Sequence, residues 1–165
     1  MNLINSVTVM LKGKPMLVKV YGLDKDEVID KFSRAYVIVS DKKGNVALIY
    51  NSKMGIWGFP GGHPNKLESI KECATRECAE EINYSIKSYE ARYVLVNDLE
   101  NKRELQVICF AMLGNKKIDT LDEKESVSDI KFIHSSKVLP KIGNDPMWKD
   151  IINSFRKWQK SMLKS

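Results

Sequence analysis

Cysteine and histidine are scarce in this chain of 165 residues, which contains three cysteines and two histidines. They form no CxxC motif and no mixed cysteine–histidine cluster, so the sequence has no pattern typical of a zinc site. Cys73 and Cys78 lie five residues apart, and on one helix they would point to different faces. An odd number of cysteines without paired spacing is typical of a reducing compartment, and we expect a cytoplasmic protein.

Long apolar runs are missing as well. No segment approaches the roughly 20 consecutive apolar residues that a membrane-spanning helix needs. Residues 1–11 lack the basic start and the long apolar stretch of a signal peptide. The sequence also has no internal repeat, linker or low-complexity segment. A content of 43% hydrophobic and 29% charged residues is typical of one globular domain with a sizeable core, and we expect no membrane partner.

The charge balance is positive, with 27 lysines and arginines against 21 acidic residues and a formal net charge of +6. This excess is compatible with a polyanionic substrate. A lysine-rich surface is also an ordinary means of solubility, and we favour that explanation by about two to one. We expect a nucleotide-type small molecule as substrate and no stable nucleic-acid partner.

Residues 62–84 are the most informative part of the sequence, because six residues lie there at fixed offsets. They are Gly62, Glu68, Arg76, Glu77, Glu80 and Glu81. At an ordinary usage of roughly one in fifteen per residue type, six such matches arise by chance in about one window in 10⁷. An acidic cluster on a helix is usually a solvated face, but the upstream glycine and the spacing from Glu68 to Arg76 indicate a functional site.

The spacing of the three later glutamates places their carboxylates side by side on a helix. Glu77, Glu80 and Glu81 fall within about one third of the helix circumference. Neighbouring like charges destabilise a helix unless a salt bridge, a raised pKa or a bound cation relieves them. Mg²⁺ and Mn²⁺ prefer oxygen ligands of this kind. A small apolar stripe beside the glutamates is expected to pack on the core and consists of Ala74, Cys78 and Ile82.

Both ends of the expected helix have candidate capping residues. Asn65 is the expected N-cap, with Glu68 three residues later as its partner in a capping box. Asn83 suits the left-handed C-terminal cap, for which asparagine ranks after glycine. Residues 57–62 read WGFPGG, and the paired glycines let backbone groups approach a ligand or a metal closely.

This segment resembles the Nudix box, G-x5-E-x7-R-E-U-x-E-E-x-G-U, in which U is a bulky apolar residue. The six residues above all match, while Asn83 replaces the second glycine and Cys78 occupies an apolar position. The resemblance implies an α/β protein with the Nudix fold, an α/β/α sandwich around a central mixed β-sheet. It also implies an active enzyme that uses Mg²⁺ or Mn²⁺ to hydrolyse a diphosphate linked to another group, usually a nucleoside.

The resemblance further implies a role for each residue of the box. Arg76 would orient Glu77 through a bidentate pair, and Glu68 and Gly62 would hold the loop and the helix together. The implied metal ligands are Glu77, Glu80, Glu81 and the carbonyl oxygen of Gly61.

A carboxylate would take the proton of the attacking water, and the family offers two sources for it. One is a glutamate of the box helix, with Glu77 and Glu80 as candidates. The other is an acid in a later loop, here residues 122–125 with the sequence DEKE, from which we choose Glu125. An ordinary charged surface loop explains Glu125 about equally well.

Strand patterns surround the box over about residues 33–160. The final helix is expected to open with Asp145 as N-cap and Pro146 in the first turn. Its apolar residues recur at helical spacing, so packing against the domain is favoured about five to one over binding a membrane or a partner. The expected strands are residues 35–39, 46–50, 89–96, 104–113 and 130–133, with a polar loop at residues 97–103.

Residues 1–32 precede this core and are expected to extend the same domain, with residues 33–165 as the Nudix hydrolase domain. Residues 8–21 are typical of a β-hairpin and residues 24–31 of a short helix. The sequence leaves open whether the extension covers a sheet edge, completes a substrate pocket or forms a dimer interface. It therefore leaves open whether the protein is a monomer or a homodimer.

By the resemblance, a basic residue beside the phosphate site often comes from the first core strands, and Arg34 and Lys53 are the candidates. A solvated charge is the more frequent explanation for each of them taken singly. We expect His63 and His134 to be ordinary polar residues rather than ligand contacts. Trp57 is expected to pack against the sheet rather than to stack on a base.

The box identifies chemistry at a diphosphate but not the groups attached to it. Leu99 stands where ADP-ribose hydrolases often have proline, and Asn101 and Lys102 stand where dinucleoside-polyphosphate hydrolases often have tyrosine. Elimination leaves a MutT-like hydrolase that converts a nucleoside triphosphate to a monophosphate and pyrophosphate. One alternative is a hydrolase of nucleotide sugars or other diphosphate conjugates. Another is a non-catalytic nucleotide- or RNA-binding module, which the retained box glutamates argue against.

Overall fold

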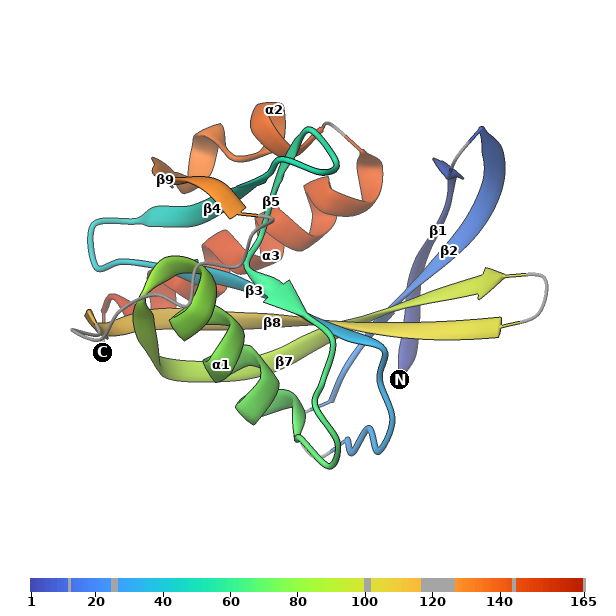
Figure 1. Cartoon of the computed structure of the whole chain (residues 1–165), viewed down its shortest axis with the longest axis horizontal. Coiled ribbons are helices and arrows are strands. Elements are labelled where there is room, and N and C mark those ends of the chain that lie inside the picture. The colour runs from blue at the N-terminus through green and yellow to red at the C-terminus, as the bar shows by residue number, and fades with distance from the viewer. Residues whose placement is uncertain (12, 25–26, 100–101, 117–126, 144, 165) are drawn as a thin grey trace.

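The structure is a computed structural model of the chain, and it describes residues 1–11, 13–24, 27–99, 102–116, 127–143 and 145–164. Figure 1 shows how the elements follow one another from the N-terminal hairpin to the C-terminal helix. In chain order they are β1 (Asn2–Leu11), β2 (Lys14–Gly22), β3 (Arg34–Ser40), β4 (Asn45–Asn51), β5 (Ile56–Gly58), β6 (Gly61–Gly62), α1 (Ile70–Ile82), β7 (Tyr84–Leu99), β8 (Lys102–Lys116), β9 (Val127–His134), the 3₁₀ helix η1 (Ser135–Lys137), α2 (Leu139–Ile142) and α3 (Pro146–Met162).

A mixed sheet of nine strands organises the described residues, in the order β1-β2-β7-β8-β3-β4-β5. Off this path, β6 pairs with β3 and β9 pairs with β4. β3 and β8 run parallel, whereas the other strand pairs are antiparallel. α1 lies on one side of the sheet and α3 on the other (Figure 1), which confirms the expected α/β/α sandwich.

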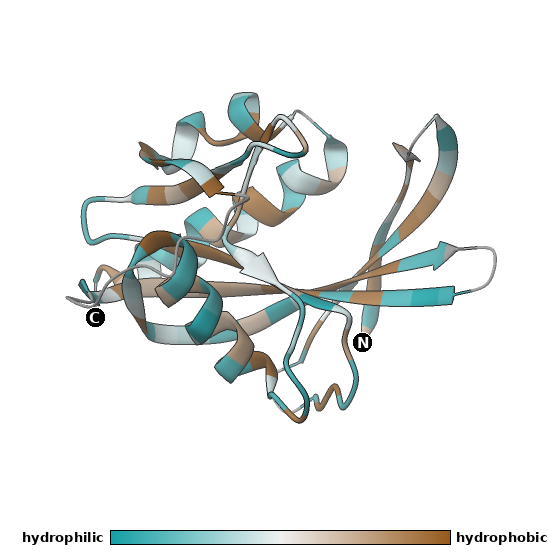
Figure 2. Cartoon of the chain, in the orientation of Figure 1, coloured by the Kyte–Doolittle hydropathy of each residue, from teal (hydrophilic) through white to brown (hydrophobic). Residues whose placement is uncertain are grey.

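Alternation along β3 divides the core between the two helices, because successive side chains of a strand point to opposite faces. Val37 and Val39 are fully buried on the α1 side, and Ile38 is fully buried on the α3 side. The apolar stripe of α1 packs in the first of these layers, as expected, and consists of Ala74, Cys78 and Ile82. Figure 2 shows the hydrophobic residues gathered along the central strands, while the far ends of β7 and β8 are hydrophilic.

The C-terminal helix begins as expected and packs against the domain. Asp145 is its N-cap and accepts a hydrogen bond from the Met147 amide at 2.9 Å. Its apolar face belongs to the core on the α3 side, with these buried residues: Met147, Ile151, Ile152, Phe155 and Trp158. Within the described part of the chain, no helix is both long enough and apolar enough to cross a membrane.

β7 and β8 are longer than expected, because most of the predicted loop at residues 97–103 continues the two strands. Asp98 and Arg103 are paired across this extension, with Arg103 Nε donating to Asp98 Oδ1 at 2.8 Å. Cross-strand pairs of opposite charge stabilise paired strands even where the side chains are polar. Polar composition alone was therefore a poor guide to the end of these strands.

The predicted helix at residues 24–31 is wrong, since its described residues form neither helix nor strand. One turn closes, with the Glu27 amide donating to the Asp24 carbonyl at 3.1 Å. The Glu27 carboxylate pairs with the amino terminus of Met1 at 2.5 Å. This long-range contact joins the segment to the residue before β1.

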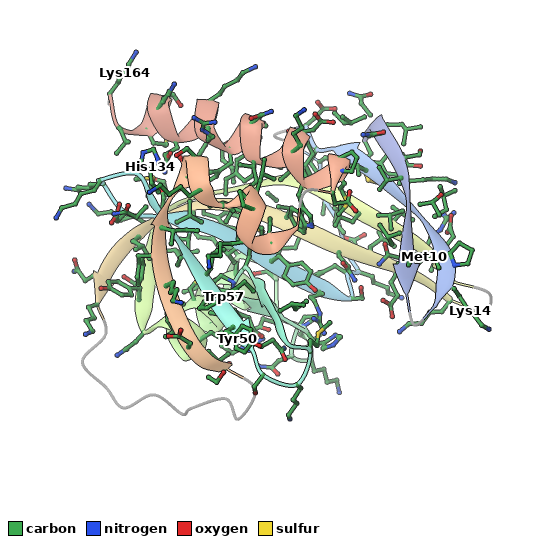
Figure 3. All side chains as sticks on the ribbon, turned by 90° about the horizontal axis from the view of Figure 1, so that it is seen from above. Met10, Lys14, Tyr50, Trp57, His134 and Lys164 are labelled. Carbon is green, nitrogen blue, oxygen red and sulfur yellow. The ribbon has the colours of Figure 1, made fainter. Side chains whose placement is uncertain are left out.

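The N-terminal hairpin extends the sheet, because β2 pairs antiparallel with β7 from Val18 to Gly22. Val18 and Val20 are 3% and 2% exposed and belong to the core on the α3 side. β2 thus covers the edge of β7. The tip of the hairpin, marked by Met10 and Lys14, lies well away from Trp57 (Figure 3).

Candidate active site

Arg76, in the middle of α1, is the centre of a network of ion pairs. Its Nε and Nη2 donate to the two carboxylate oxygens of Glu68, each at 2.8 Å. Its Nη1 donates to Glu77 Oε1 at 2.8 Å and to Glu80 Oε2 at 3.2 Å. Its Nη2 also donates to the carbonyl oxygen of His63 at 2.9 Å. The bidentate partner of Arg76 is therefore Glu68, where the sequence predicted Glu77, because the loop before α1 folds back over the helix.

This loop has its own turn, and α1 begins later than predicted. Leu67 adopts φ +65°, a left-handed conformation that interrupts any helix starting at Asn65. The N-cap is Ser69, which forms a capping box with Glu72. The predicted pair of Asn65 and Glu68 does form, with the Asn65 amide donating to Glu68 Oε2 at 2.8 Å, but it closes the separate turn.

Two glycines let buried carboxylates lie against the backbone. Glu77 is 1% exposed, and a Cβ added at Gly62 would lie 2.2 Å from Glu77 Oε1. Glu81 is 6% exposed, and its Oε2 accepts a hydrogen bond from the Gly61 amide at 2.8 Å. A Cβ at Gly61 would lie 2.2 Å from the carbonyl oxygen of Ala35. Any larger residue at either glycine would therefore displace the carboxylates or the strand beside them.

Arg76 and Glu68 stabilise each other's charged forms within this network. The hydrogen bonds from Arg76 hold the pKa of Glu68 below its usual value. The hydrogen bonds to Glu68 and then Glu77 raise the pKa of Arg76 above its already high value. When all are ionised, Glu68, Glu77, Glu80 and Glu81 carry four negative charges against one positive charge, a net charge of −3. Such a surplus favours a cation.

The donors of this network fit a hard divalent cation. They are carboxylates, oxygen ligands of the kind that Mg²⁺ and Mn²⁺ prefer. The carbonyl oxygen of Gly61, a ligand implied by the resemblance, belongs to the residue whose amide is bonded to Glu81. Among the residues that the structure describes, no three His, Cys, Asp or Glu side chains converge as a ready-made metal cluster. Arg76 and the Gly61 amide hold oxygens of Glu77, Glu80 and Glu81, so a cation would replace some of these hydrogen bonds. Glu125 lies outside the described residues.

The two basic candidates occupy different places. Arg34, at the start of β3, contacts His63 of the glycine loop through Nη2 at 2.8 Å. Arg34 also lines the same cavity as Gly61 and Glu81. Lys53 is exposed in the turn between β4 and β5 and does not line that cavity.

A cavity of about 190 Å³ adjoins the carboxylates at Gly61 and Glu81. Four aromatic rings from different elements dominate its lining, and they belong to Tyr36, Trp57, Phe59 and Trp148. Its remaining lining residues are Arg34, Ile49, Asn51, Met54, Ile56, Gly58 and Ile142. None of the first 32 residues that the structure describes lines it, so the N-terminal hairpin does not complete this cavity.

Trp57 packs against the core, as expected, and also forms part of the cavity wall. Tyr50 lies beside it, with ring centroids 5.3 Å apart, and the two labelled rings are neighbours in Figure 3. Lys131 Nζ lies 4.6 Å from the centroid of the Trp57 ring. His134 lies at the end of β9, where its Nδ1 contacts Ser136 Oγ at 2.8 Å, and does not line the cavity.

Sequence reasoning missed most of the aromatic lining. Tyr36 lies in an expected strand and Trp148 in an expected helix, and the two residues (36 and 148) are 112 positions apart in the sequence. Neither belongs to a motif, and only packing of α3 against the sheet brings them to one cavity. The single available signal was Trp57, directly before the glycine loop.

The fold and the carboxylate network on α1 together point to one class of protein. The protein-family model described as the NUDIX domain matches residues 30–152, and the chain belongs to this family. Nudix hydrolases act on phosphorus-containing acid anhydrides and generally use divalent metal ions.

Solved structures of Nudix proteins have the same fold. A pyrophosphohydrolase of Bacillus subtilis, BsRppH, is 18% identical with a TM-score of 0.70, covering 92% of this chain and 96% of that one. An Ap4A hydrolase of C. elegans is 18% identical with a TM-score of 0.59, over 79% and 99% of the two chains. The NUDIX domain of Shewanella oneidensis NrtR, complexed with ADP ribose, is 20% identical with a TM-score of 0.59, over 82% and 92%. At these identities the similarity establishes the fold.

Proposed function

We propose that this protein hydrolyses a nucleoside triphosphate to a nucleoside monophosphate and pyrophosphate. The observation that carries the proposal is the junction of the two halves of the site at Gly61 and Glu81. On one side lies the carboxylate network of α1, and on the other lies the aromatic cavity. A planar base bound by aromatic rings would leave its phosphates at the carboxylates.

The cavity is large enough for one ring system but too small for a whole nucleotide. Sites for drug-sized ligands commonly enclose roughly 300–1,000 Å³. About 190 Å³ is less than this, so the sugar and the phosphates would extend out of the cavity towards Glu81. Binding by stacking would also tolerate several bases, since every base has an aromatic face.

In this proposal Glu77, Glu80, Glu81 and the Gly61 carbonyl hold Mg²⁺ or Mn²⁺. A bound divalent cation supplies charge neutralisation of the diphosphate and a lowered pKa for water. Glu80 is our candidate for the base that takes the proton, because its side chain is 31% exposed whereas that of Glu77 is 2% exposed. Glu125 remains the second candidate.

Product analysis tests the proposal. A panel of nucleoside triphosphates, nucleotide sugars and dinucleoside polyphosphates is incubated with Mg²⁺, with Mn²⁺ and with a chelator. We expect monophosphate plus pyrophosphate, no product with the chelator, and a kcat lowered about 10²–10⁴-fold in Glu80→Gln. Glu90→Gln, which removes the same charge from β7, is the matched control. Glu125→Gln compares the second base candidate.

Other products would redirect or refute the proposal. A sugar phosphate from a nucleotide sugar would establish the diphosphate-conjugate alternative. Binding of nucleotide or RNA without turnover of any substrate would contradict hydrolysis and favour the binding module.

The place of the base is tested at Trp57. Truncation by Trp57→Ala removes one aromatic wall of the cavity, and a stacking contact contributes about 1–3 kcal/mol per base. We expect a KM at least about fivefold higher for nucleoside triphosphates, with unchanged hydrolysis of inorganic tripolyphosphate if that compound is a substrate. A KM unchanged for nucleotides would place the base elsewhere.

A further inference from the structure

Arg34 and His63 form a hydrogen bond whose direction the neighbouring groups determine. His63 Nδ1 lies 2.7 Å from the carbonyl oxygen of Ser33, and His63 Nε2 lies 2.8 Å from Arg34 Nη2. A carbonyl oxygen only accepts, so Nδ1 must carry the ring proton. The guanidinium only donates, so Nε2 must accept. His63 is therefore the neutral Nδ1–H tautomer with its lone pair directed at Arg34.

Three contacts fix the guanidinium of Arg34. Besides the bond to His63, its Nη1 donates to the hydroxyl of Tyr36 at 3.1 Å. Its Cζ lies 5.5 Å from the centroid of the Tyr36 ring. A free arginine side chain loses rotamer entropy when it binds a ligand. These contacts remove part of that freedom before a ligand arrives.

The partners of Arg34 are neutral, in contrast to those of Arg76. Arg76 pairs with Glu68, Glu77 and Glu80, which compensate its charge. Within the described ranges no carboxylate forms an ion pair with Arg34. Its positive charge therefore remains available to an anion, at the border between the aromatic cavity and Glu81.

His63 is also tied to the box helix through its backbone. Its carbonyl oxygen accepts the 2.9 Å hydrogen bond from Arg76 Nη2, while its ring accepts from Arg34. One residue thus links the arginine of the carboxylate network with the arginine of the cavity mouth.

We propose that His63 is a positioning residue that holds Arg34 in place to bind a phosphate oxygen of the substrate. This phosphate is the one that, in the proposed function, lies at the mouth of the cavity beside Glu81. The inference therefore rests on the proposed function. His63 itself does not touch the reacting atoms. This proposed role differs from the expectation that His63 is an ordinary polar residue of the glycine loop.

Kinetics of matched variants test the proposal. His63→Ala and Arg34→Ala should each raise KM about three- to tenfold and leave kcat within about twofold, because they remove a ground-state contact to phosphate. His63→Gln retains a side-chain acceptor and should stay within about twofold of the parent in KM. The double variant should resemble Arg34→Ala, since His63 acts through Arg34. Multiplying effects in the double variant, or a loss of kcat with unchanged KM, would overturn the proposal.

A measurement without substrate separates this proposal from the proposed function. Ring ¹⁵N chemical shifts of His63 should report the Nδ1–H tautomer in the parent protein, and the Nε2 resonance should shift in Arg34→Ala. An Nε2–H tautomer in the parent would overturn the proposal even if nucleotides are hydrolysed. If no nucleotide is turned over, equilibrium binding of a nucleoside triphosphate to the same variants replaces KM. Equal affinity of the parent and His63→Ala would then refute the positioning role.

Discussion

At the residue scale, the site depends on close approaches between carboxylates and backbone that leave no room for a methyl group. Gly62 is the clearest case, because the space of its absent Cβ is filled by the carboxylate of Glu77. Glu77 cannot retreat easily, since it is 1% exposed and also accepts from Arg76. The geometry of the carboxylates is thus coupled to the identity of the glycines.

Gly62→Ala is therefore expected to inactivate the enzyme by moving the Glu77 carboxylate. Oε1 and Oε2 would lie 2.2 and 2.8 Å from the new Cβ, and either the carboxylate or β6 must shift. We expect kcat to fall at least about 10²-fold, since small misplacements cost this much in catalysis. Thermal unfolding should show a lowered Tm, whereas Gly58→Ala, which meets no atom within 4 Å, should keep its Tm. A fully active Gly62→Ala would show that Glu77 does not need this position.

The pair of Glu68 and Arg76 predicts a pH-dependent contribution to stability. Because the folded-state pKa of Glu68 is lowered from 4.5, its stabilisation is fully present above about pH 4.5 and is lost as the pH falls through the lowered pKa. Glu68→Gln should lower the free energy of unfolding by about 1–2 kcal/mol at pH 7. Urea titrations of both proteins from pH 7 to pH 3 should show this difference shrinking below pH 4.5. A difference that stays constant to pH 3 would contradict the ionic origin.

At the element scale, α1 is defined by its ends as much as by its apolar stripe. Ser69 and Glu72 close its start, and Asn83 closes its end with φ 61° and ψ 37°, donating from its backbone to the Cys78 carbonyl. The left-handed conformation at the C-cap is as expected from asparagine. These ends fix which turn of the helix faces the glycine loop, and hence where the box glutamates lie.

Substitutions at Asn83 test this C-cap. Glycine adopts the left-handed conformation without steric cost, whereas for a β-branched residue this conformation costs about 1–2 kcal/mol of conformational free energy. We expect Asn83→Gly to be neutral or slightly stabilising and Asn83→Val to lower the free energy of unfolding by at least about 1 kcal/mol. Denaturant unfolding monitored by circular dichroism measures both. Equal losses in the two variants would point to a side-chain contact of Asn83 instead of its backbone conformation.

At the scale of the whole molecule, the N-terminal hairpin is built into the sheet. β2 pairs with β7, and Val18 and Val20 are buried in the same core cluster as Phe110 of β8. We propose on this basis that residues 1–32 belong to the same domain as the remainder. The match to BsRppH, over 92% of 165 residues, leaves about 13 residues outside, so it must include part of this extension.

Deletion of residues 1–22 is the corresponding test. Removal of two buried valines alone costs about 3–6 kcal/mol of hydrophobic burial, and the edge of β7 becomes open for aggregation. We expect a lower denaturant midpoint and concentration-dependent association of the shortened protein, measured by urea unfolding and light scattering. An unchanged midpoint would show that the hairpin is an independent unit.

Motif residues close together in the sequence could be placed well in advance. The glutamates of α1, its apolar stripe, the C-cap at Asn83 and the N-cap at Asp145 all depend on neighbours within about one or two helical turns. Helical geometry relates such residues by fixed angles, so their mutual positions follow from spacing. The apolar runs of the central strands are local in the same sense and placed those strands, whereas the layers of the sandwich were implied by the resemblance to the Nudix box.

The sequence by itself thus determined which helix carries the box glutamates and how they lie relative to one another, because short-range periodicity relates them. The class of chemistry and the layers of the fold followed from the resemblance of this spacing to the Nudix box. The tertiary structure decided that Arg76 takes Glu68 as its bidentate partner, that the helix starts after Ser69, and that Trp148 meets Tyr36 in one cavity. These contacts join segments whose separation depends on how the loop, the sheet and α3 pack together. No local propensity encodes that packing, since it is settled by the summed burial of the whole core.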